Sequence, residues 1–181
     1  MITQKILEAY YKKSPFGEDG GISQKTIYVY AGPYLIPIPN IALRQSVVVY
    51  HDLHHIISGY SNSRIGEGEV GAWELATNCW NKPLAVYLNL CGMATGILYA
   101  PKRMMKAFMQ GCCCTNLYDL SAAELLDKEF TLLQSYVFDA KCKGRKRAIN
   151  QLRFAFYFCA ALAILPGMLI VGWLYQIRRT Q

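Results

Sequence analysis

The three histidines of this 181-residue chain all lie within five residues, in the stretch HDLHH at 51–55. On a helix, His51, Asp52 and His55 fall within an arc of about 100°, and His54 lies on the far side of His51. Two imidazoles at positions i and i+4 with a carboxylate between them resemble the arrangement of zinc-binding HExxH helices. The spacing therefore predicts a divalent-metal site.

A further ligand must come from another part of the chain, and three glutamates follow closely. Glu67 opens the next expected helix, and a helix, turn and helix would bring it back across His55. Glu74 lies two turns further along the same face, whereas Glu69 points elsewhere. Asp52 is either a ligand or a group that holds an imidazole tautomer. The predicted ligands are His51, Asp52, His55 and Glu67, and the predicted proton carriers are Glu67 and Glu74.

Zinc is the metal expected first, with magnesium or iron as alternatives. The competing interpretation needs no metal, because the histidines could pack or cap a helix while Asp52 is only a surface charge. The clustering of every histidine beside several carboxylates favours the metal.

The elements that position these residues are predicted to be mostly helical. Residues 2–12 have the pattern of a short amphipathic helix, and residues 26–39 that of an extended segment ending in prolines. Asn40 is the expected N-cap of a helix that runs to about Ile57 and stops at Gly59. Ser63 is the expected start of a second helix, which ends at Asn81-Lys82-Pro83.

The second half of the predicted domain, residues 1–140, is helical too. Residues 84–99 form an apolar helix in which Gly92 and Gly96 permit close contact with a neighbouring helix, and a homodimer through these glycines is a weaker alternative. Ser121 and Glu124 form a capping box that opens a helix to about Ala140.

The C-terminal part contains 22 residues without a charge, at 154–175. A helix of this length spans roughly 33 Å, enough to cross the hydrocarbon core, so we predict a transmembrane helix. A basic juxtamembrane segment at 141–153 precedes it, and a short basic tail at 176–181 follows. Because more basic residues precede the span than follow it, the globular domain is expected on the cytoplasmic side of a bacterial inner membrane, or on the matrix side of the mitochondrial inner membrane in a eukaryote.

The net charge of +7 does not indicate nucleic-acid binding. Residues 140–181 hold eight of the 19 basic residues and no acidic residue, which leaves eleven basic against twelve acidic residues in the rest of the chain. The body of the protein is therefore not basic, and nucleic acid is not an expected partner.

His51-Asp52-x-x-His55, followed by eleven residues and Glu67, resembles the HDxxH-x11-E signature of the coenzyme Q biosynthesis protein four family. Gly59, the Gly66-Glu67 pair and the Trp73-Glu74 pair extend the similarity, which covers about residues 33–120. The chain departs from the family in being shorter than its eukaryotic members and in its predicted membrane span.

This resemblance implies a mostly helical fold, a divalent metal at His51, Asp52, His55 and Glu67, and an apolar groove for a polyisoprenoid tail. It implies a role in ubiquinone biosynthesis, with other enzymes of that route as partners at the membrane. The activity implied is oxidative decarboxylation of a prenylated ring precursor, in which a hydroxyl group replaces the carboxyl group. The alternative is a non-catalytic scaffold or a protein that presents prenyl lipids.

Two other enzyme classes fit less well. A zinc peptidase of the HExxH type needs a glutamate where Asp52 stands, and the shorter aspartate reaches less far. A carboxylate-bridged di-iron centre wants two ExxH-like elements, and the chain offers only one comparable element.

Overall fold

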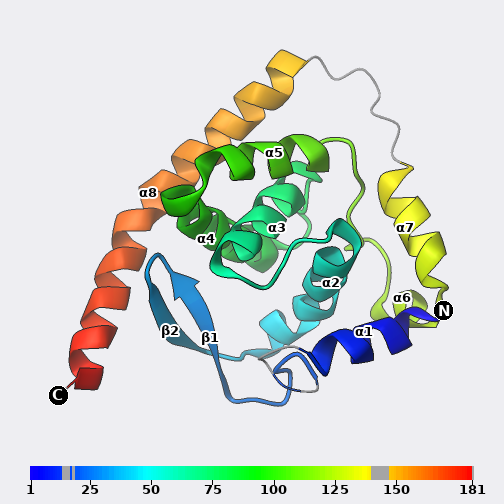
Figure 1. Cartoon of the computed structure of the whole chain (residues 1–181), viewed down its shortest axis with the longest axis horizontal. Helices are drawn as coiled ribbons and strands as arrows, with labels where there is room; N and C mark the ends of the chain where they lie inside the picture. The colour runs from blue at the N-terminus through cyan, green and yellow to red at the C-terminus, as the bar shows by residue number, and fades with distance from the viewer. Residues whose placement is uncertain (14–16, 18, 140–146, 181) are drawn as a thin grey trace.

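The computed structural model describes residues 1–13, 17, 19–139 and 147–180. Over these residues the chain forms eight helices and one two-stranded antiparallel sheet, which confirms the prediction of a mostly helical fold (Figure 1). In chain order the elements are α1 (Thr3–Tyr11), β1 (Thr26–Ala31), β2 (Tyr34–Pro39), α2 (Ala42–Ser58), α3 (Arg64–Ala76), α4 (Pro83–Tyr99), α5 (Pro101–Gly111), α6 (Ala122–Asp127), α7 (Phe130–Phe138) and α8 (Arg147–Thr180).

The helix that carries the histidines, α2, ends where the sequence predicts. Gly59 adopts a left-handed backbone with φ of 77°, and its N–H donates to the His55 carbonyl. The predicted N-cap at Asn40 is wrong. The side-chain amide of Asn40 donates instead to carbonyl oxygens of the preceding loop, among them that of Gly21 at 2.8 Å. Ile41 takes the N-cap position and makes no side-chain cap.

Helix α3 begins at the predicted cap, but it ends at Ala76 and not at the predicted Asn81-Lys82-Pro83. The Ser63 hydroxyl accepts a hydrogen bond from the Gly66 N–H at 3.2 Å. Gly66 also has no room for a side chain, because a Cβ there would lie 1.8 Å from the Ser61 carbonyl oxygen. The tight turn between α2 and α3 therefore depends on Gly66, the residue just before Glu67.

Helices α3 and α4 pack unusually closely because glycines line both of them. A Cβ on Gly68 would lie 2.8 Å from the Gly96 Cα, and a Cβ on Gly71 would lie 2.7 Å from the Asn89 carbonyl oxygen. The prediction that Gly92 and Gly96 allow close helix contact is confirmed, and the contact is made within the chain, to α3. The core around these helices includes the fully buried Trp73, Leu53, Met93 and Phe108.

The extended segment at residues 26–39 is confirmed as a hairpin. Strand β1 pairs with β2 so that Thr26 lies opposite Pro39 at one end and Ala31 lies opposite Tyr34 at the other. Prolines are tolerated in β2 because it is an edge strand of a two-stranded sheet. The hairpin lies against α4 and α8 and forms one wall of the site described below (Figure 1).

The single helix predicted from Ser121 to about Ala140 is wrong. The capping box of Ser121 and Glu124 is present, but α6 stops at Asp127 and α7 begins at Phe130. The N-terminal segment causes the break, since the Thr3 N–H donates to the Lys128 carbonyl at 2.9 Å and Ile2 forms a β-bridge with Glu129. Ala140 lies outside the described residues.

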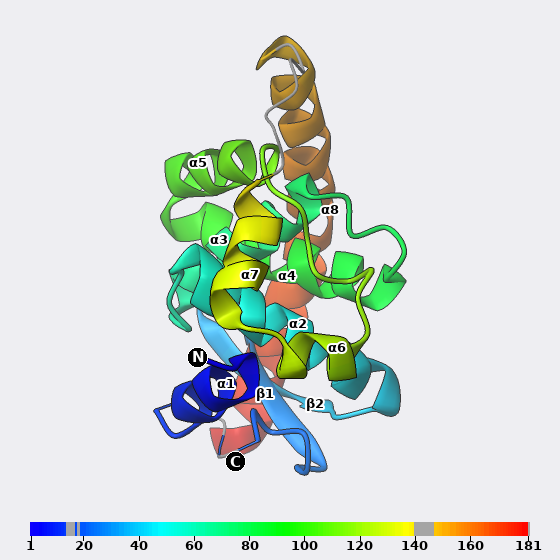
Figure 2. The same cartoon turned by 90° about the vertical axis from the view of Figure 1, so that its right-hand side faces the viewer.

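Helix α8 is 34 residues long and contains all of the predicted apolar run at 154–175. It is long and apolar enough to cross a membrane, and Pro166 lies within it without ending it. The helix runs along one side of the body from end to end (Figures 1 and 2). The predicted juxtamembrane segment lies partly outside the described residues, and from Arg147 it is already helix, as is the predicted tail up to Thr180.

Candidate metal centre

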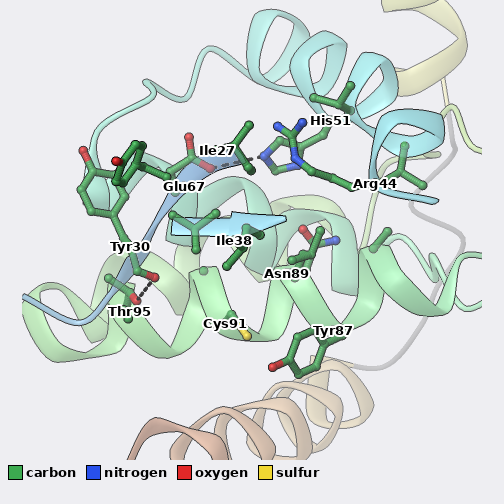
Figure 3. Close-up of a pocket in the computed structure, with 18 of the residues that line it drawn as sticks. Ile27, Tyr30, Ile38, Arg44, His51, Glu67, Tyr87, Asn89, Cys91 and Thr95 are labelled. Atoms are coloured by element: carbon green, nitrogen blue, oxygen red, sulfur yellow. Dashed lines mark hydrogen bonds and ion pairs between the residues drawn. The ribbon is translucent and has the colours of Figure 1, made fainter. Parts of the chain in front are cut away.

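His51 and His55 of α2 meet Glu67 of α3 where the two helices face each other, and Figure 3 shows His51 and Glu67 pointing toward one another. The Glu67 carboxylate oxygens lie 3.3 Å from His51 Nε2 and 3.4 Å from His55 Nε2. The two Nε2 atoms are 3.2 Å apart. Two nitrogens bound to one zinc ion at about 2.0 Å in a tetrahedron lie about 3.3 Å apart. These residues can therefore hold a metal ion.

The hydrogen bonds of the two rings leave both Nε2 lone pairs directed at Glu67. His55 Nδ1 lies 3.0 Å from the Tyr60 carbonyl oxygen, which can only accept, so Nδ1 carries the hydrogen. His51 Nδ1 lies 3.0 Å from a Glu74 carboxylate oxygen and is a donor for the same reason. Two lone pairs and a carboxylate facing one another need a proton or a cation between them. A metal ion fits this donor set.

Glu74 lies behind His51, on the side of the ring away from Glu67. Its carboxylate is fully buried and accepts hydrogen bonds from four side chains, namely His51 at 3.0 Å, His54 at 2.8 Å, Asn89 at 2.6 Å and Tyr118 at 2.5 Å. These bonds fix the position of Glu74 and hold His51 in the tautomer that a metal requires. The structure therefore places Glu74 as a positioning residue for His51.

His54 has a structural role, consistent with its predicted place away from the other two histidines. Its Nε2 accepts a hydrogen bond from the Leu117 N–H at 3.0 Å, and its Nδ1 donates to Glu74. The ring is fully buried, with the Trp73 ring centroid 5.1 Å away. With both nitrogens occupied, His54 ties α2 to the segment before α6.

Asp52 lies beside the three-residue group but is not part of it. Its Oδ2 atom is buried, and among the described residues it has no hydrogen-bond partner. A Cβ on Gly20 would lie 3.0 Å from this oxygen, so the loop before β1 covers it closely. The structure thus brings together three of the four predicted ligands, and the fourth, Asp52, lines the same cavity with one buried oxygen that has no hydrogen-bond partner among the described residues.

Burial and charge act in opposite directions at this centre. Burial alone would lower the pKa of His51, but Glu74 and Glu67 raise that pKa well above its ordinary value. Burial would raise the pKa of Glu67, but His55 and His51 lower it far below its ordinary value. Burial raises the pKa of Asp52 to about 6. The carboxylates therefore create a negative potential that favours a bound cation.

The centre opens on a cavity of about 230 Å³ with mostly apolar walls. His51 and Glu67 lie at one end of it, each with 25% of the side chain exposed (Figure 3). The walls come from β1, β2, α2 and α4, with Met168 contributed by α8. A ligand with a polar head and an apolar tail would place its head at the metal-binding residues.

Several residues of this site were not predicted from the sequence. Arg44 lines the cavity beside His51, and its guanidinium donates to the Asn40 side chain at 3.0 Å (Figure 3). Its place seven residues before His51, on the same helix face, could have revealed it. Asn89 and Tyr118 have no comparable signal, because their contacts with Glu74 depend on tertiary packing.

No protein-family model, curated protein or solved structure matches this chain. The geometry of the centre and its cavity is therefore what indicates a function.

Proposed function

We propose that this protein is a membrane-attached, metal-dependent protein of ubiquinone biosynthesis that acts on a prenylated ring precursor. The observation that carries the proposal is the group of His51, His55 and Glu67 at the polar end of an apolar cavity. Such a cavity suits a substrate whose ring meets the metal-binding residues while its polyisoprenoid tail lies against β1, β2 and α4.

The proposed activity is oxidative decarboxylation, with a hydroxyl group taking the place of the ring carboxyl group. His51, His55 and Glu67 would hold the metal, with zinc expected first and magnesium or iron as alternatives. Bound there, a divalent metal supplies Lewis-acid polarisation of the ring's oxygen substituents. Arg44 can pair with the ring carboxylate, and Asp52 faces the same space.

Of the two predicted proton carriers, Glu67 is the better placed, because it faces the cavity whereas Glu74 is enclosed by four hydrogen bonds. Replacing carboxyl by hydroxyl with water as the oxygen source releases carbon dioxide, two protons and two electrons. Molecular oxygen or another oxidant must accept those electrons, because zinc has no redox chemistry.

The long apolar helix α8 supports attachment to a membrane, where polyisoprenoid substrates are found. It can attach the protein by crossing the bilayer, as the sequence predicts, or by lying along one surface. The proposed cellular location is the cytoplasmic face of a bacterial inner membrane, or the matrix face of the mitochondrial inner membrane. Other quinone-biosynthesis enzymes are the proposed partners there.

The test is an assay of the metal-loaded protein, in detergent and air, with a prenylated hydroxybenzoic acid labelled at the carboxyl carbon. We expect labelled carbon dioxide and a ring with one more hydroxyl group from the wild type, and neither from Glu67→Gln. The matched control is Glu69→Gln, because Glu69 pairs with Arg103 at 2.8 Å and stands outside the metal group. No turnover in wild type or control would reject an enzyme acting on this substrate class.

A scaffold that presents prenyl lipids is the second candidate, and the buried cluster around Glu74 favours it. That cluster joins α2, α3, α4 and the segment before α6, so a metal on His51 could serve mainly to stabilise the fold. In that case Glu67→Gln would lower thermal stability and lipid binding together, and the wild type would bind the labelled acid without converting it.

A further inference from the structure

One face of α8 is buried from Asn150 to Gly172. Its buried residues are spaced by four or seven positions, one or two helical turns apart: Asn150, Tyr157, Ala161, Leu165 and Gly172. Near its start, Arg153 donates to the Ala76 carbonyl at 3.0 Å, and near its end a Cβ on Gly172 would lie 2.5 Å from the Tyr34 ring. The helix is therefore fixed to α3, α4, α5 and the hairpin along most of its length, and only its first turns extend past the body (Figures 1 and 2).

The opposite face of α8 is apolar and exposed. From Phe156 to Leu174 this face carries no charged residue, and its large exposed side chains are Phe156, Leu162, Ile170, Val171, Trp173 and Leu174. The last four are each 46–57% exposed. We call these six residues the outer face of α8. A continuous apolar surface of this length indicates a partner that removes it from water.

The packing of α8 argues against a helix that crosses the bilayer alone. If α8 stood across the membrane, the elements fixed beside it would enter the hydrocarbon as well. Helix α5, which packs on α8, carries exposed Lys102, Arg103 and Lys106. Lysine and arginine deep in hydrocarbon are costly, so the side-by-side packing disfavours this orientation.

The charges around α8 fit the surface of an anionic membrane. The described helix has Arg147 at its start and Arg178 and Arg179 in its last turn, and in the sequence no acidic residue follows Asp139. Basic residues at both ends of an apolar face can reach lipid phosphates while the face enters the acyl chains. Trp173 near one end is a residue type that prefers this interface.

The cavity borders this helix, which favours lipid as the occupant over another protein. Met168 of α8 and Cys91 of α4 form part of its wall, and Tyr87, also on the wall, is 57% exposed (Figure 3). A lipid tail in the cavity would therefore leave it beside α8, at the depth of the acyl chains.

We infer that α8 lies in the plane of the membrane, with its outer face in one leaflet of an anionic bilayer and the whole body on a single side. The protein is then monotopic, and the cavity beside α8 receives lipid tails directly from that leaflet. This inference does not depend on the metal or on the reaction.

The first test is the side on which the C-terminus lies. The full chain is produced in bacteria with either green fluorescent protein or alkaline phosphatase at the C-terminus, and with green fluorescent protein at the N-terminus as the control. We expect both fluorescent fusions to be bright in the membrane fraction and the phosphatase fusion to be inactive. An active phosphatase fusion together with a bright N-terminal fusion would show a spanning helix and overturn the inference.

The second test is co-flotation of the purified chain with vesicles, made either of phosphatidylcholine alone or of phosphatidylcholine with phosphatidylglycerol. We expect stronger binding to the anionic vesicles, and at least about a tenfold loss of binding for Ile170→Glu with Leu174→Glu. The matched control is Leu132→Glu, a leucine on α7 that is 59% exposed and lies at the other side of the body (Figure 1). This variant should bind like the wild type.

If instead the wild type ignores vesicles and forms dimers that the double variant abolishes, the outer face binds a second copy of the chain, and the inference is wrong. Equal vesicle binding by wild type and double variant would also overturn it. Metal content is measured on the same samples, so a failure of the membrane inference can be told apart from a failure of the proposed function.

Discussion

At the scale of single residues, the centre depends on which nitrogen of each histidine carries the hydrogen. Tyr60 and Glu74 accept from the Nδ1 atoms of His55 and His51, which leaves both Nε2 atoms free to bind. The histidines were recognisable in the sequence as a pair because helix geometry alone brings positions i and i+4 together. The role of Glu74 could not be recognised in the sequence, because it depends on where α4 and Tyr118 lie in the fold.

Glu74→Gln tests this positioning role. We expect the affinity for zinc to fall between about tenfold and a hundredfold, because an amide lacks the negative charge that polarises the His51 Nδ1–H and offers one acceptor oxygen in place of two to the four donors around it. The affinity is measured by competition with a coloured chelator. Tyr118→Phe is the control: it removes one bond to the other Glu74 oxygen, and zinc affinity should change by less than about threefold. Unchanged affinity in Glu74→Gln would show that Glu74 does not orient His51.

Asp52→Asn should have opposite effects on stability and on metal binding. In chelator at pH 7, removing the charge of a buried carboxylate whose pKa is raised to about 6 should raise the free energy of unfolding in urea by about 1–3 kcal/mol. With zinc present, the variant should bind the metal more weakly than the wild type, because a negative charge beside the centre is lost. A variant that is less stable in chelator would show that burial does not disfavour the charged form of Asp52.

At the scale of elements, the ends of helices could be predicted from the sequence where a hydrogen bond between nearby residues determines them. Ser63, Gly59 and the Ser121–Glu124 pair act within a few residues, and each stands where expected. The prediction failed where distant segments compete for the backbone. Lys128 bonds to the N-terminus, and Asn40 bonds to a preceding loop, and neither partner is visible in a local pattern.

Gly68→Ala tests the close packing of α3 on α4. A Cβ there would lie 2.8 Å from the Gly96 Cα, so we expect a loss of about 1–3 kcal/mol in the free energy of unfolding in urea. Gly167→Ala is the matched control in α8, where a Cβ would meet nothing within 4 Å and alanine favours helix. Equal stability of the two variants would contradict the glycine-dependent contact.

At the scale of the whole molecule, the body and α8 behave as one packed unit. The sequence predicted a body at residues 1–140 and a separate membrane helix, because hydropathy alone shows that a helix is apolar and not which face is covered. The described helix buries Tyr157, Ala161 and Leu165 against the body. The lack of a clear polar stripe hid this inner face from sequence reasoning.

A chain truncated after residue 146 tests whether the body needs α8 in order to fold. Because removal of α8 exposes the apolar surface of α4 and the hairpin, we expect the truncated chain to aggregate during size-exclusion chromatography in buffer without detergent. A monodisperse fragment that still binds zinc would show that the body folds without α8.

The central claim is that His51, His55 and Glu67 hold one divalent metal, and elemental mass spectrometry on the detergent-purified protein tests it most directly. After exposure to zinc and removal of the excess, we expect about one metal per chain in the wild type and in Glu69→Gln, and almost none in His55→Ala and Glu67→Gln. Circular dichroism confirms that each variant is folded. No metal in the wild type, or the same content in all four proteins, would contradict the claim.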